Sequence, residues 1–324
     1  MDEEILKALE RTKEVVDSYI EENLPRGGPN GLYDACWHLI EAGGKRLRPL
    51  LVLESCKALG GKEEDALPEA AAVELVHTFT LIHDDIMDED DERRGVPAVH
   101  VEWGVPIAIL AGDTLFSKAF EFAARGGSER AVDELARACT EICEGQAMDI
   151  EFEDREDVTE EEFIEMVRRK TAALMRASCV IGGLKADAEE EQLEALAEYG
   201  ENMGIAFQIQ DDVLDLVGDE EELGKPVGSD IIEGKKTLIV IKALEEADEE
   251  TRERILEVLG NPNATREDVM EVIGIMEELG AIDYAKEKAR EFALKAKEAL
   301  EELPDNEHTE LLRRIADFVV EREF

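Results

Sequence analysis

Two short acidic segments are the residues of this sequence best suited to chemistry. Each has the pattern Asp-Asp-x-x-Asp, one over residues 84–88 and the other over residues 211–215. Residues four apart share one face of a helix, so the first and last aspartate of each segment should point together. Paired carboxylates are oxygen ligands suited to Mg²⁺, which proteins usually hold through a few carboxylates plus substrate phosphates. The spacing therefore predicts magnesium sites for a phosphate-bearing substrate.

The apolar residues around both motifs favour this interpretation over two solvated acidic faces. Large hydrophobic side chains flank the aspartates on both sides, namely Phe79, Leu81 and Ile82 for the first motif and Phe207, Ile209 and Leu216 for the second. A carboxylate buried without a partner costs several kcal/mol, so carboxylates in such surroundings need cations.

Basic residues, which are scarce here, gather near the acidic motifs. Residues 43–49 place Lys45, Arg46 and Arg48 beside two glycines, and His77 lies seven residues before Asp84 on nearly the same helix face. Further bases follow the motifs at Arg93, Arg94, Lys170, Lys225 and Lys235. Lysine and arginine beside glycine backbone suit phosphate oxygens. We expect local ion pairing instead for Arg168, Arg169 and Lys236.

The elements that carry these residues should all be helices. Apolar residues recur with helical spacing, as at Ile5, Leu9 and Val16, and Thr159 with Glu162 forms a capping box that should start a helix. The breaks are short, for example over residues 60–68 and 94–106, and none is a long linker. We therefore predict an all-α chain of about ten or more helices in a single domain over residues 1–324.

Composition limits the partners and the location of the chain. It has 81 acidic and 36 basic residues, a net charge of −45, which argues against nucleic-acid and anionic-membrane surfaces. Hydrophobic residues make up 44%, which argues against disorder. Five scattered cysteines, an acidic start and no apolar run of about 20 residues predict a cytoplasmic protein without a membrane span. The acidity, without matching lysine, favours a salt-rich cytoplasm.

Taken in order, the motifs resemble those of the trans-isoprenyl diphosphate synthases, especially archaeal geranylgeranyl and farnesyl diphosphate synthases. The resemblance runs from about Tyr33 to Asp317 through G-G-K-R-L-R-P, L-I-H-D-D-I-M-D, R-R-G, K-T-A, F-Q-I-Q-D-D and G-K-P-x-G-S-D. It implies the isoprenoid synthase type I fold, with helices around a deep central cavity, and a homodimer. It also implies condensation of isopentenyl diphosphate with an allylic diphosphate, with release of pyrophosphate.

The same resemblance assigns roles to individual residues. Three magnesium ions that clamp the allylic diphosphate would be bound by Asp84, Asp88 and Asp211, with Asp85, Asp212 and Asp215 as supporting ligands. The same diphosphate would be held by Arg93, Lys170, Lys225 and Lys235. Isopentenyl diphosphate would be held without metal by Lys45, Arg48, His77 and Arg94. Thr171 and Gln208 would direct oxygens toward the carbocation.

The product length should depend on side chains one to two turns before Asp84, since five residues of helix span about 7.5 Å. In the resembling archaeal enzymes, an aromatic residue at the fifth position before the motif with a smaller neighbour goes with a twenty-carbon product. Phe79 and Thr80 have this pattern, although Thr80 lies nearer the face of Asp84 on a helical wheel. We therefore expect mainly geranylgeranyl diphosphate, with a farnesyl or bifunctional synthase as the alternative.

Two other functions fit the sequence less well. A terpene cyclase on the same fold would usually replace the second aspartate motif with N-x-x-x-S-x-x-x-E, and it would have no use for a second diphosphate site. A non-catalytic helical subunit of a synthase pair would tend to lose the acidic motifs, and both are intact here.

Overall fold

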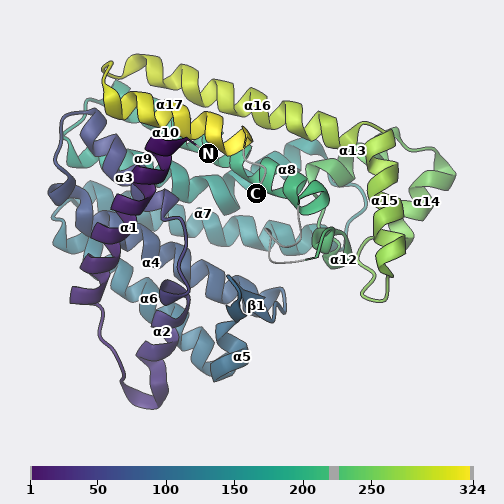
Figure 1. Ribbon diagram of the computed structural model, residues 1–324, viewed down its shortest axis with the longest axis horizontal. Helices are drawn as coiled ribbons and strands as arrows, with labels where there is room; N and C mark the ends of the chain where they lie inside the picture. Colours follow the sequence, from purple (N-terminus) through teal and green to yellow (C-terminus); the bar gives the residue numbers. More distant parts are fainter. Residues whose placement is uncertain (1, 219–225, 322–324) are drawn as a thin grey trace. The chain divides into compact units, whose positions relative to one another are not determined.

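The structure, a computed structural model, describes residues 2–218 and 226–321 (Figure 1). The first half contains α1 Glu3–Asn23, η1 Pro29–Gly31, α2 Leu32–Glu41, α3 Leu47–Ala58, α4 Glu63–Met87, β1 Glu92–Arg93, β2 Val96–Pro97, α5 Val99–Trp103, α6 Val105–Arg125 and α7 Glu129–Glu153. The second half contains α8 Glu160–Val167, η2 Arg168–Ala172, α9 Ala173–Lys185, α10 Glu190–Val217, α12 Ser229–Glu233, α13 Leu238–Glu246, α14 Glu249–Val258, α15 Arg266–Glu278, α16 Ala281–Ala299, η3 Leu300–Glu302 and α17 Glu307–Glu321. The all-α prediction is confirmed.

Within the described residues, the only sheet is a two-residue antiparallel ladder between β1 and β2. Arg94 and Gly95 connect the strands, and both have positive φ, at 56° and 74°. A two-residue hairpin turn with positive φ at both central positions matches the twist of the paired strands. The hairpin comes shortly after the first acidic motif. It fixes the backbone positions from which the side chains of Arg93 and Arg94 extend.

Contacts divide the chain into two compact units. Unit 1 comprises Met1–Cys139, Leu174–Ala197 and Leu300–Arg314, and unit 2 comprises Thr140–Ala173, Glu198–Ala299 and Ile315–Phe324. The first acidic motif belongs to unit 1 and the second to unit 2. The single domain and the central cavity therefore stay predictions.

The core of unit 1 is built on α4, which packs most extensively against α6 and next against α3. Small residues are buried on both facing helices, with Ala70, Ala71 and Ala72 on α4 and Ala108 and Ala111 on α6. They let the two helices approach closely, and the apolar area they remove from water stabilises the pair. This packing holds the end of α4 that carries the first acidic motif.

The core of unit 2 gathers around α13, whose first four residues, Leu238, Ile239, Val240 and Ile241, are all buried. It also contains Phe163 of α8 and Ile209 and Val213 of α10. The second acidic motif therefore lies on a helix anchored in this core. The predicted capping box is confirmed, because Thr159 accepts from the backbone N–H of Glu162 and the Glu162 carboxylate accepts from that of Thr159.

Two of the predicted breaks between helices are partly wrong. The break at residues 60–68 ends early, because α4 begins at Glu63 and continues through Pro68. Burial of Ala66 and Glu69–Ala72 on either side of that proline outweighs its poor helix propensity. The break at residues 94–106 contains the short helix α5 and the start of α6, which Gly104 separates with a φ of 81°.

Candidate active site

The first acidic motif lies at the carboxyl end of α4. Asp84 and Asp85 occupy its last turn, and Asp88 caps the helix with its backbone N–H 2.8 Å from the Asp84 carbonyl oxygen. This bond keeps Asp84 and Asp88 in helical register, as the spacing predicts. Both side chains are partly exposed, whereas Asp85 is fully buried. The outer two aspartates can therefore reach a ligand while the middle one faces the protein.

Arg93 holds the buried aspartate in place. Its Nε donates to Oδ1 of Asp85 at 2.7 Å, and its Nη2 donates to Oδ2 of Asp90 at 3.0 Å. The second oxygen of Asp85 is buried and has no hydrogen-bond partner. Burial raises the pKa of Asp85, and the guanidinium of Arg93 opposes that shift.

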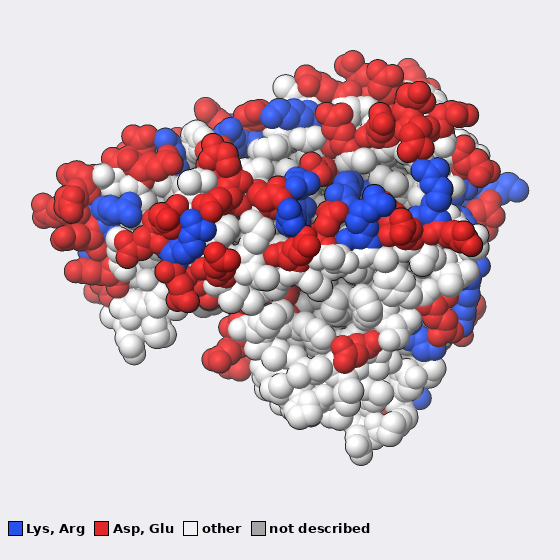
Figure 2. Space-filling view, turned by 180° about the vertical axis from the view of Figure 1, so that it is seen from behind, with Lys and Arg blue, Asp and Glu red and all other residues white. Residues whose placement is uncertain are grey.

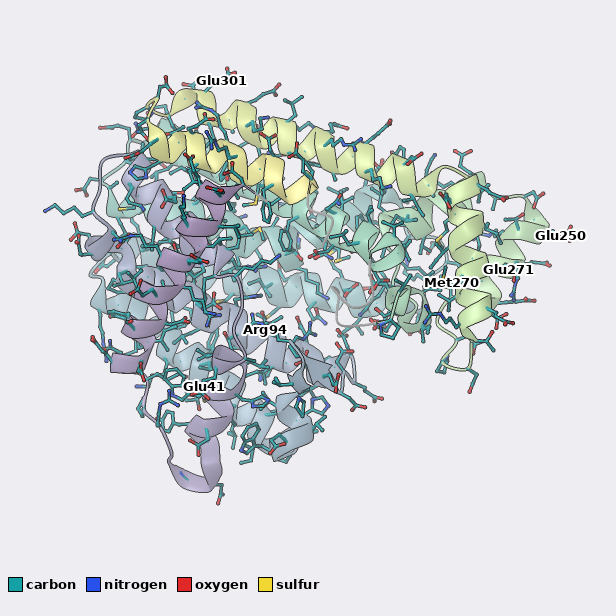
Figure 3. The ribbon with its side chains drawn as sticks, in the orientation of Figure 1. Glu41, Arg94, Glu250, Met270, Glu271 and Glu301 are labelled. Atoms are coloured by element: carbon teal, nitrogen blue, oxygen red, sulfur yellow. The ribbon has the colours of Figure 1, made fainter. Side chains whose placement is uncertain are left out.

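The predicted isopentenyl diphosphate residues lie around the loop before α3. Lys45 is exposed in the loop, and Arg48 is half-buried in the first turn of α3. Nη1 of Arg48 lies 3.4 Å from Nε2 of His77 on α4. Arg94, labelled in Figure 3, donates to the backbone carbonyl oxygens of Leu39 and Gly43. Contacts within unit 1 thus link Arg48 to His77 and Arg94 to the loop.

The surroundings of His77 favour its neutral form over its charged form. Burial, followed by the charges of Arg48 and Arg94, lowers its pKa well below the ordinary value. A neutral imidazole carries one N–H, so His77 can still donate one hydrogen bond to an anionic oxygen.

The two predicted chain-length residues differ in their surroundings. The ring of Phe79 packs edge-to-face against Phe116 of α6 at 5.2 Å and against His83 at 5.4 Å, measured between ring centres. Thr80 donates its hydroxyl back to the His77 carbonyl oxygen of its own helix at 2.8 Å. Phe79 is therefore part of an aromatic cluster between α4 and α6, which also includes Phe120.

The second acidic motif lies inside α10, near its carboxyl end. Asp211 is partly exposed, whereas Asp212 and Asp215 are buried. The two oxygens of Asp215 accept from the Ser229 hydroxyl at 2.7 Å and the Asp230 backbone N–H at 3.2 Å. Asp215 therefore anchors the start of α12, which is a supporting contact.

A polar chain connects Thr171 to the second motif. The Thr171 hydroxyl donates to Oε1 of Gln208 at 2.8 Å, and Nε2 of Gln208 donates to Oδ1 of Asp212 at 2.8 Å. Oδ2 of Asp212 is buried without a hydrogen-bond partner. Burial, followed by the nearby charge of Asp230, raises the pKa of Asp212 well above its ordinary value.

Two predicted lysines converge on Asp149, which was not among the residues predicted from the sequence. Nζ of Lys170 lies 2.5 Å from Oδ2 of Asp149, and Nζ of Lys235 lies 3.6 Å from the same oxygen and 3.0 Å from Oε1 of Glu153. Burial by itself raises the pKa of Asp149, but the two lysines bring it below its ordinary value. Lys225 lies outside the described residues.

Gln146 is a second residue missed from the sequence. It is 7% exposed, and both polar atoms of its side chain are buried without a hydrogen-bond partner. Gln146, Asp149 and Glu153 are spaced three and four apart on α7, so they share a helix face. This spacing of polar residues is the feature of the sequence that could have identified Gln146 as a site residue.

Arg168 and Arg169 form local ion pairs, as predicted, whereas Lys236 bonds to backbone carbonyl oxygens instead. Both arginines pair with Glu165, one turn earlier, and Arg169 also pairs with Glu144. Lys236 donates to the backbone carbonyl oxygens of Glu153 and Gly234.

The donor set of both motifs fits magnesium. It consists of carboxylate oxygens alone, and each motif contains a buried oxygen without a hydrogen-bond partner, on Asp85 and on Asp212. Such oxygens are stabilised by a nearby cation or by water bound to it. Among the described residues, no three His, Cys, Asp or Glu side chains form a metal cluster by themselves. A site completed by substrate phosphates needs no such cluster.

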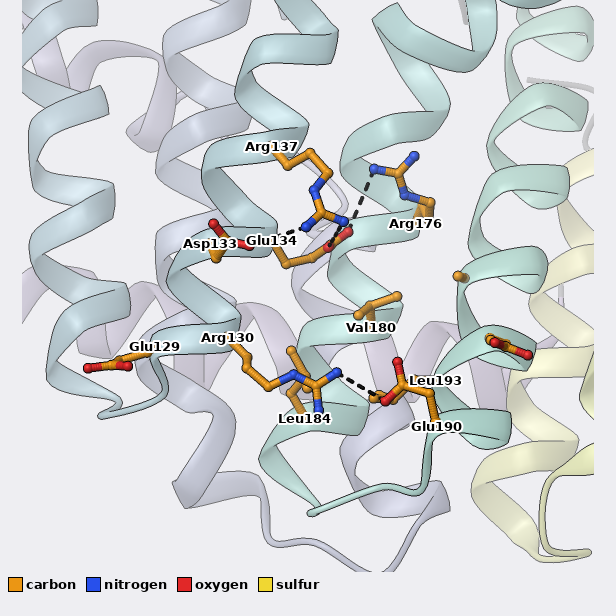
Figure 4. A pocket seen from close by; sticks show the side chains of 12 residues that line it. Glu129, Arg130, Asp133, Glu134, Arg137, Arg176, Val180, Leu184, Glu190 and Leu193 are labelled. Atoms are coloured by element: carbon orange, nitrogen blue, oxygen red, sulfur yellow. Dashed lines mark hydrogen bonds and ion pairs between the residues drawn. The ribbon is translucent and has the colours of Figure 1, made fainter.

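A separate cavity of about 490 Å³ lies among α7, α9 and α10 in unit 1 (Figure 4). None of the predicted site residues lines it. Each arginine on its wall is paired, Arg130 with Glu190, Arg137 with Asp133 and Glu134, and Arg176 with Glu134. Its charges are therefore largely satisfied within the protein.

Comparison with known proteins identifies the family. Residues 29–276 match the family described as Polyprenyl synthetase. The chain is 51% identical to a short chain isoprenyl diphosphate synthase of Methanothermobacter thermautotrophicus, covering 99% of both chains. It is 48% identical to a geranylgeranyl diphosphate synthase of Methanosarcina mazei, covering 95% of both.

A solved structure agrees with the predicted fold. The crystal structure of geranylgeranyl pyrophosphate synthetase from Pyrococcus horikoshii is 48% identical, with a TM-score of 0.92 over 98% of this chain and 99% of that one. Together with the acidic motifs on α4 and α10, these matches show that the chain belongs to the polyprenyl synthetase family.

Proposed function

We propose that this protein condenses isopentenyl diphosphate head-to-tail with allylic diphosphates, yields mainly geranylgeranyl diphosphate and releases pyrophosphate. The observation that carries the proposal is the pair of Asp-Asp-x-x-Asp motifs at the ends of two core helices, each with a buried oxygen lacking a partner. The names of the Methanosarcina mazei and Pyrococcus horikoshii relatives support the twenty-carbon product.

Magnesium would be held by Asp84 and Asp88 on α4 and by Asp211 on α10, with three ions per allylic diphosphate. When bound, these ions would neutralise the leaving diphosphate as Lewis acids. Asp85, Asp212 and Asp215 would act as supporting residues, since their carboxylates contact Arg93, Gln208 and Ser229.

The bases would bind the two diphosphates separately. Lys170 and Lys235 would hold the allylic diphosphate with Arg93 and Lys225. Asp149 would keep the ammonium groups of Lys170 and Lys235 beside each other, because it contacts both. Lys45, Arg48, His77 and Arg94 would hold isopentenyl diphosphate without metal. Positive charge aimed at the departing diphosphate lowers the barrier to breaking the allylic C–O bond.

Thr171 and Gln208 would orient oxygens toward the allylic cation. The Thr171 hydroxyl donates its proton to a hydrogen bond with Gln208. The lone pairs of the threonine oxygen can therefore face positive charge. The double bond of isopentenyl diphosphate then attacks the cation. The departing pyrophosphate can accept the final proton, so we assign no side-chain base.

A homodimer in the cytoplasm completes the proposal. Large hydrophobic side chains are exposed on α5 and α6, with Val101 at 49%, Val105 at 43% and Leu110 at 50%. In Figure 2 a broad area with few charged residues contrasts with the acid-rich remainder of that face. An exposed apolar patch of this kind suits a second copy of the chain. In the described parts of the chain, no helix is long and apolar enough to cross a membrane.

The proposal is tested by pyrophosphate release from isopentenyl diphosphate and farnesyl diphosphate. We expect release to require Mg²⁺, and Asp84→Ala or Asp211→Ala to lower kcat by several orders of magnitude in a folded protein. Asp133→Ala, which removes an exposed carboxylate of α7 paired with Arg137, is the matched control and should leave kcat unchanged. Near-normal turnover in either motif variant would contradict the proposal.

A further inference from the structure

Arg46 stands apart from the other bases of its loop because its side chain points into the protein. It lies between Lys45, which is exposed, and Arg48, which is half-buried, yet its own guanidinium is completely buried. The backbone of Arg46 has φ 54°, in the left-handed region that residues with a Cβ rarely adopt. A non-glycine residue is held there only when its surroundings determine the conformation.

The surroundings of Arg46 come from four different segments. Its Nε donates to Asp17 of α1 at 2.7 Å, and its Nη1 donates to Glu74 of α4 at 3.0 Å. The guanidinium also donates to two backbone carbonyl oxygens, those of Ile40 at the end of α2 and Gly43 in the loop. A planar guanidinium with five N–H donors can serve all of these acceptors, and a lysine ammonium cannot.

Arg46 and Arg94 together shape the turn that precedes Lys45. Both donate to the carbonyl oxygen of Gly43. A Cβ at Gly44 would lie 2.9 Å from Nη1 of Arg46 and 2.9 Å from the guanidinium of Arg94. A side chain at position 44 would therefore have to displace one of the two guanidinium groups. The path of the backbone into Lys45 is set by this contact.

The ion pairs of Arg46 with Asp17 and Glu74 stabilise the fold only while each buried charge keeps its partner. Glu74 is 2% exposed, and burial raises its pKa against the opposing charges of Arg46 and Arg94. Removing one partner of a buried ion pair leaves an uncompensated charge, which is more costly than losing the pair. The loop is thereby tied to α1 and α4 at a fixed position.

We propose that Arg46, clamped by Asp17 and Glu74, is a positioning residue that fixes the loop so that Lys45 and Arg48 can bind isopentenyl diphosphate. The proposal rests on the proposed function of those two bases. It extends the site to Asp17 on α1, a helix that precedes residues 29–276, the part of the chain matched by the family model.

Steady-state kinetics with both substrates test the proposal. Arg46→Lys keeps the charge but cannot reproduce the fork of hydrogen bonds, so we expect the KM for isopentenyl diphosphate to rise roughly tenfold. Asp17→Ala should raise it about threefold, because Glu74 and the carbonyl oxygens still hold the guanidinium. Asp17→Asn keeps an acceptor for Nε and should fall between Asp17→Ala and wild type. The KM for the allylic substrate should change less than twofold.

The matched control is Arg11→Ala, which breaks another ion pair of α1, the one between Arg11 and Glu63 at the start of α4. It should leave both KM values unchanged even where it lowers Tm. Equal rises for both substrates, or no rise in folded Arg46→Lys and Asp17→Ala, would overturn the positioning role while the condensing activity stands. Absence of condensation by the wild-type protein would overturn the proposed function and this inference with it.

Discussion

At the residue scale, the two diphosphate sites should separate by mutation. Lys45→Ala or Arg48→Ala should raise the KM for isopentenyl diphosphate more than that for the allylic substrate, because lost charge-assisted contacts cost about 1.5–3 kcal/mol. Lys57→Ala is a suitable control, since this lysine also lies on α3 but pairs with Glu54 and Glu63. Parallel rises in both KM values would show that the sites are assigned to the wrong residues.

Product length is also decided by single side chains. Phe79→Ala should give longer prenyl chains, because it removes a ring that fills space against Phe116 and His83. Thr80→Phe should shift the product toward farnesyl diphosphate by adding bulk one turn before Asp84. Chromatography of the dephosphorylated products measures both shifts.

Phe292→Ala, which removes a ring from α16 in the other unit, should not alter the product. An unchanged distribution in Phe79→Ala would make Phe79 ordinary core packing and remove the physical basis of the length assignment.

At the element scale, α7 passes so close to the segment that carries Lys170 that no added atom should fit at Gly145, where the two meet. A Cβ at Gly145 would lie 2.3 Å from the backbone nitrogen of Lys170 and 2.7 Å from its Cα. Gly145→Ala should therefore lower the free energy of unfolding by about 1–3 kcal/mol through overpacking. It should also lower kcat by displacing Lys170. Urea denaturation and turnover measure the two effects.

Gly274→Ala provides the contrast, because this glycine lies inside α15 with nothing within 4 Å of its added Cβ. Alanine is the better helix former by about 1 kcal/mol, so this variant should be slightly more stable than wild type. Equal stability of the two variants would show that the close approach at Gly145 does not constrain the fold.

Periodicity and motif spacing predicted the helical elements and the two acidic motifs, because both depend on residues near one another in sequence. Other features depend on distant partners. Arg168–Ala172 forms a π-helical turn, for which the sequence offers no local signature. The inward direction of Arg46 follows from a left-handed backbone and from Asp17 and Glu74. Asp149 becomes a candidate only when Lys170 and Lys235 are seen to meet on it.

At the scale of the whole molecule, the net charge of −45 should make stability depend on salt. Acidic side chains crowd the surface, and Glu250, Glu271 and Glu301 extend outward from it (Figures 2 and 3). Salt screens their mutual repulsion within a Debye length of about 10 Å at 0.1 M. Tm should therefore rise from low to molar KCl and rise less in an uncharged osmolyte of equal osmolality. A flat or falling Tm in KCl would contradict this account.

The central claim is that this molecule builds a twenty-carbon prenyl diphosphate. The most direct measurement incubates the wild-type protein with Mg²⁺, isopentenyl diphosphate and dimethylallyl diphosphate and identifies every product by mass. We predict geranylgeranyl diphosphate as the main product, farnesyl diphosphate as an intermediate or co-product, and no product when a chelator removes Mg²⁺. Cyclic hydrocarbons, or unchanged substrates in the presence of Mg²⁺, would contradict the account.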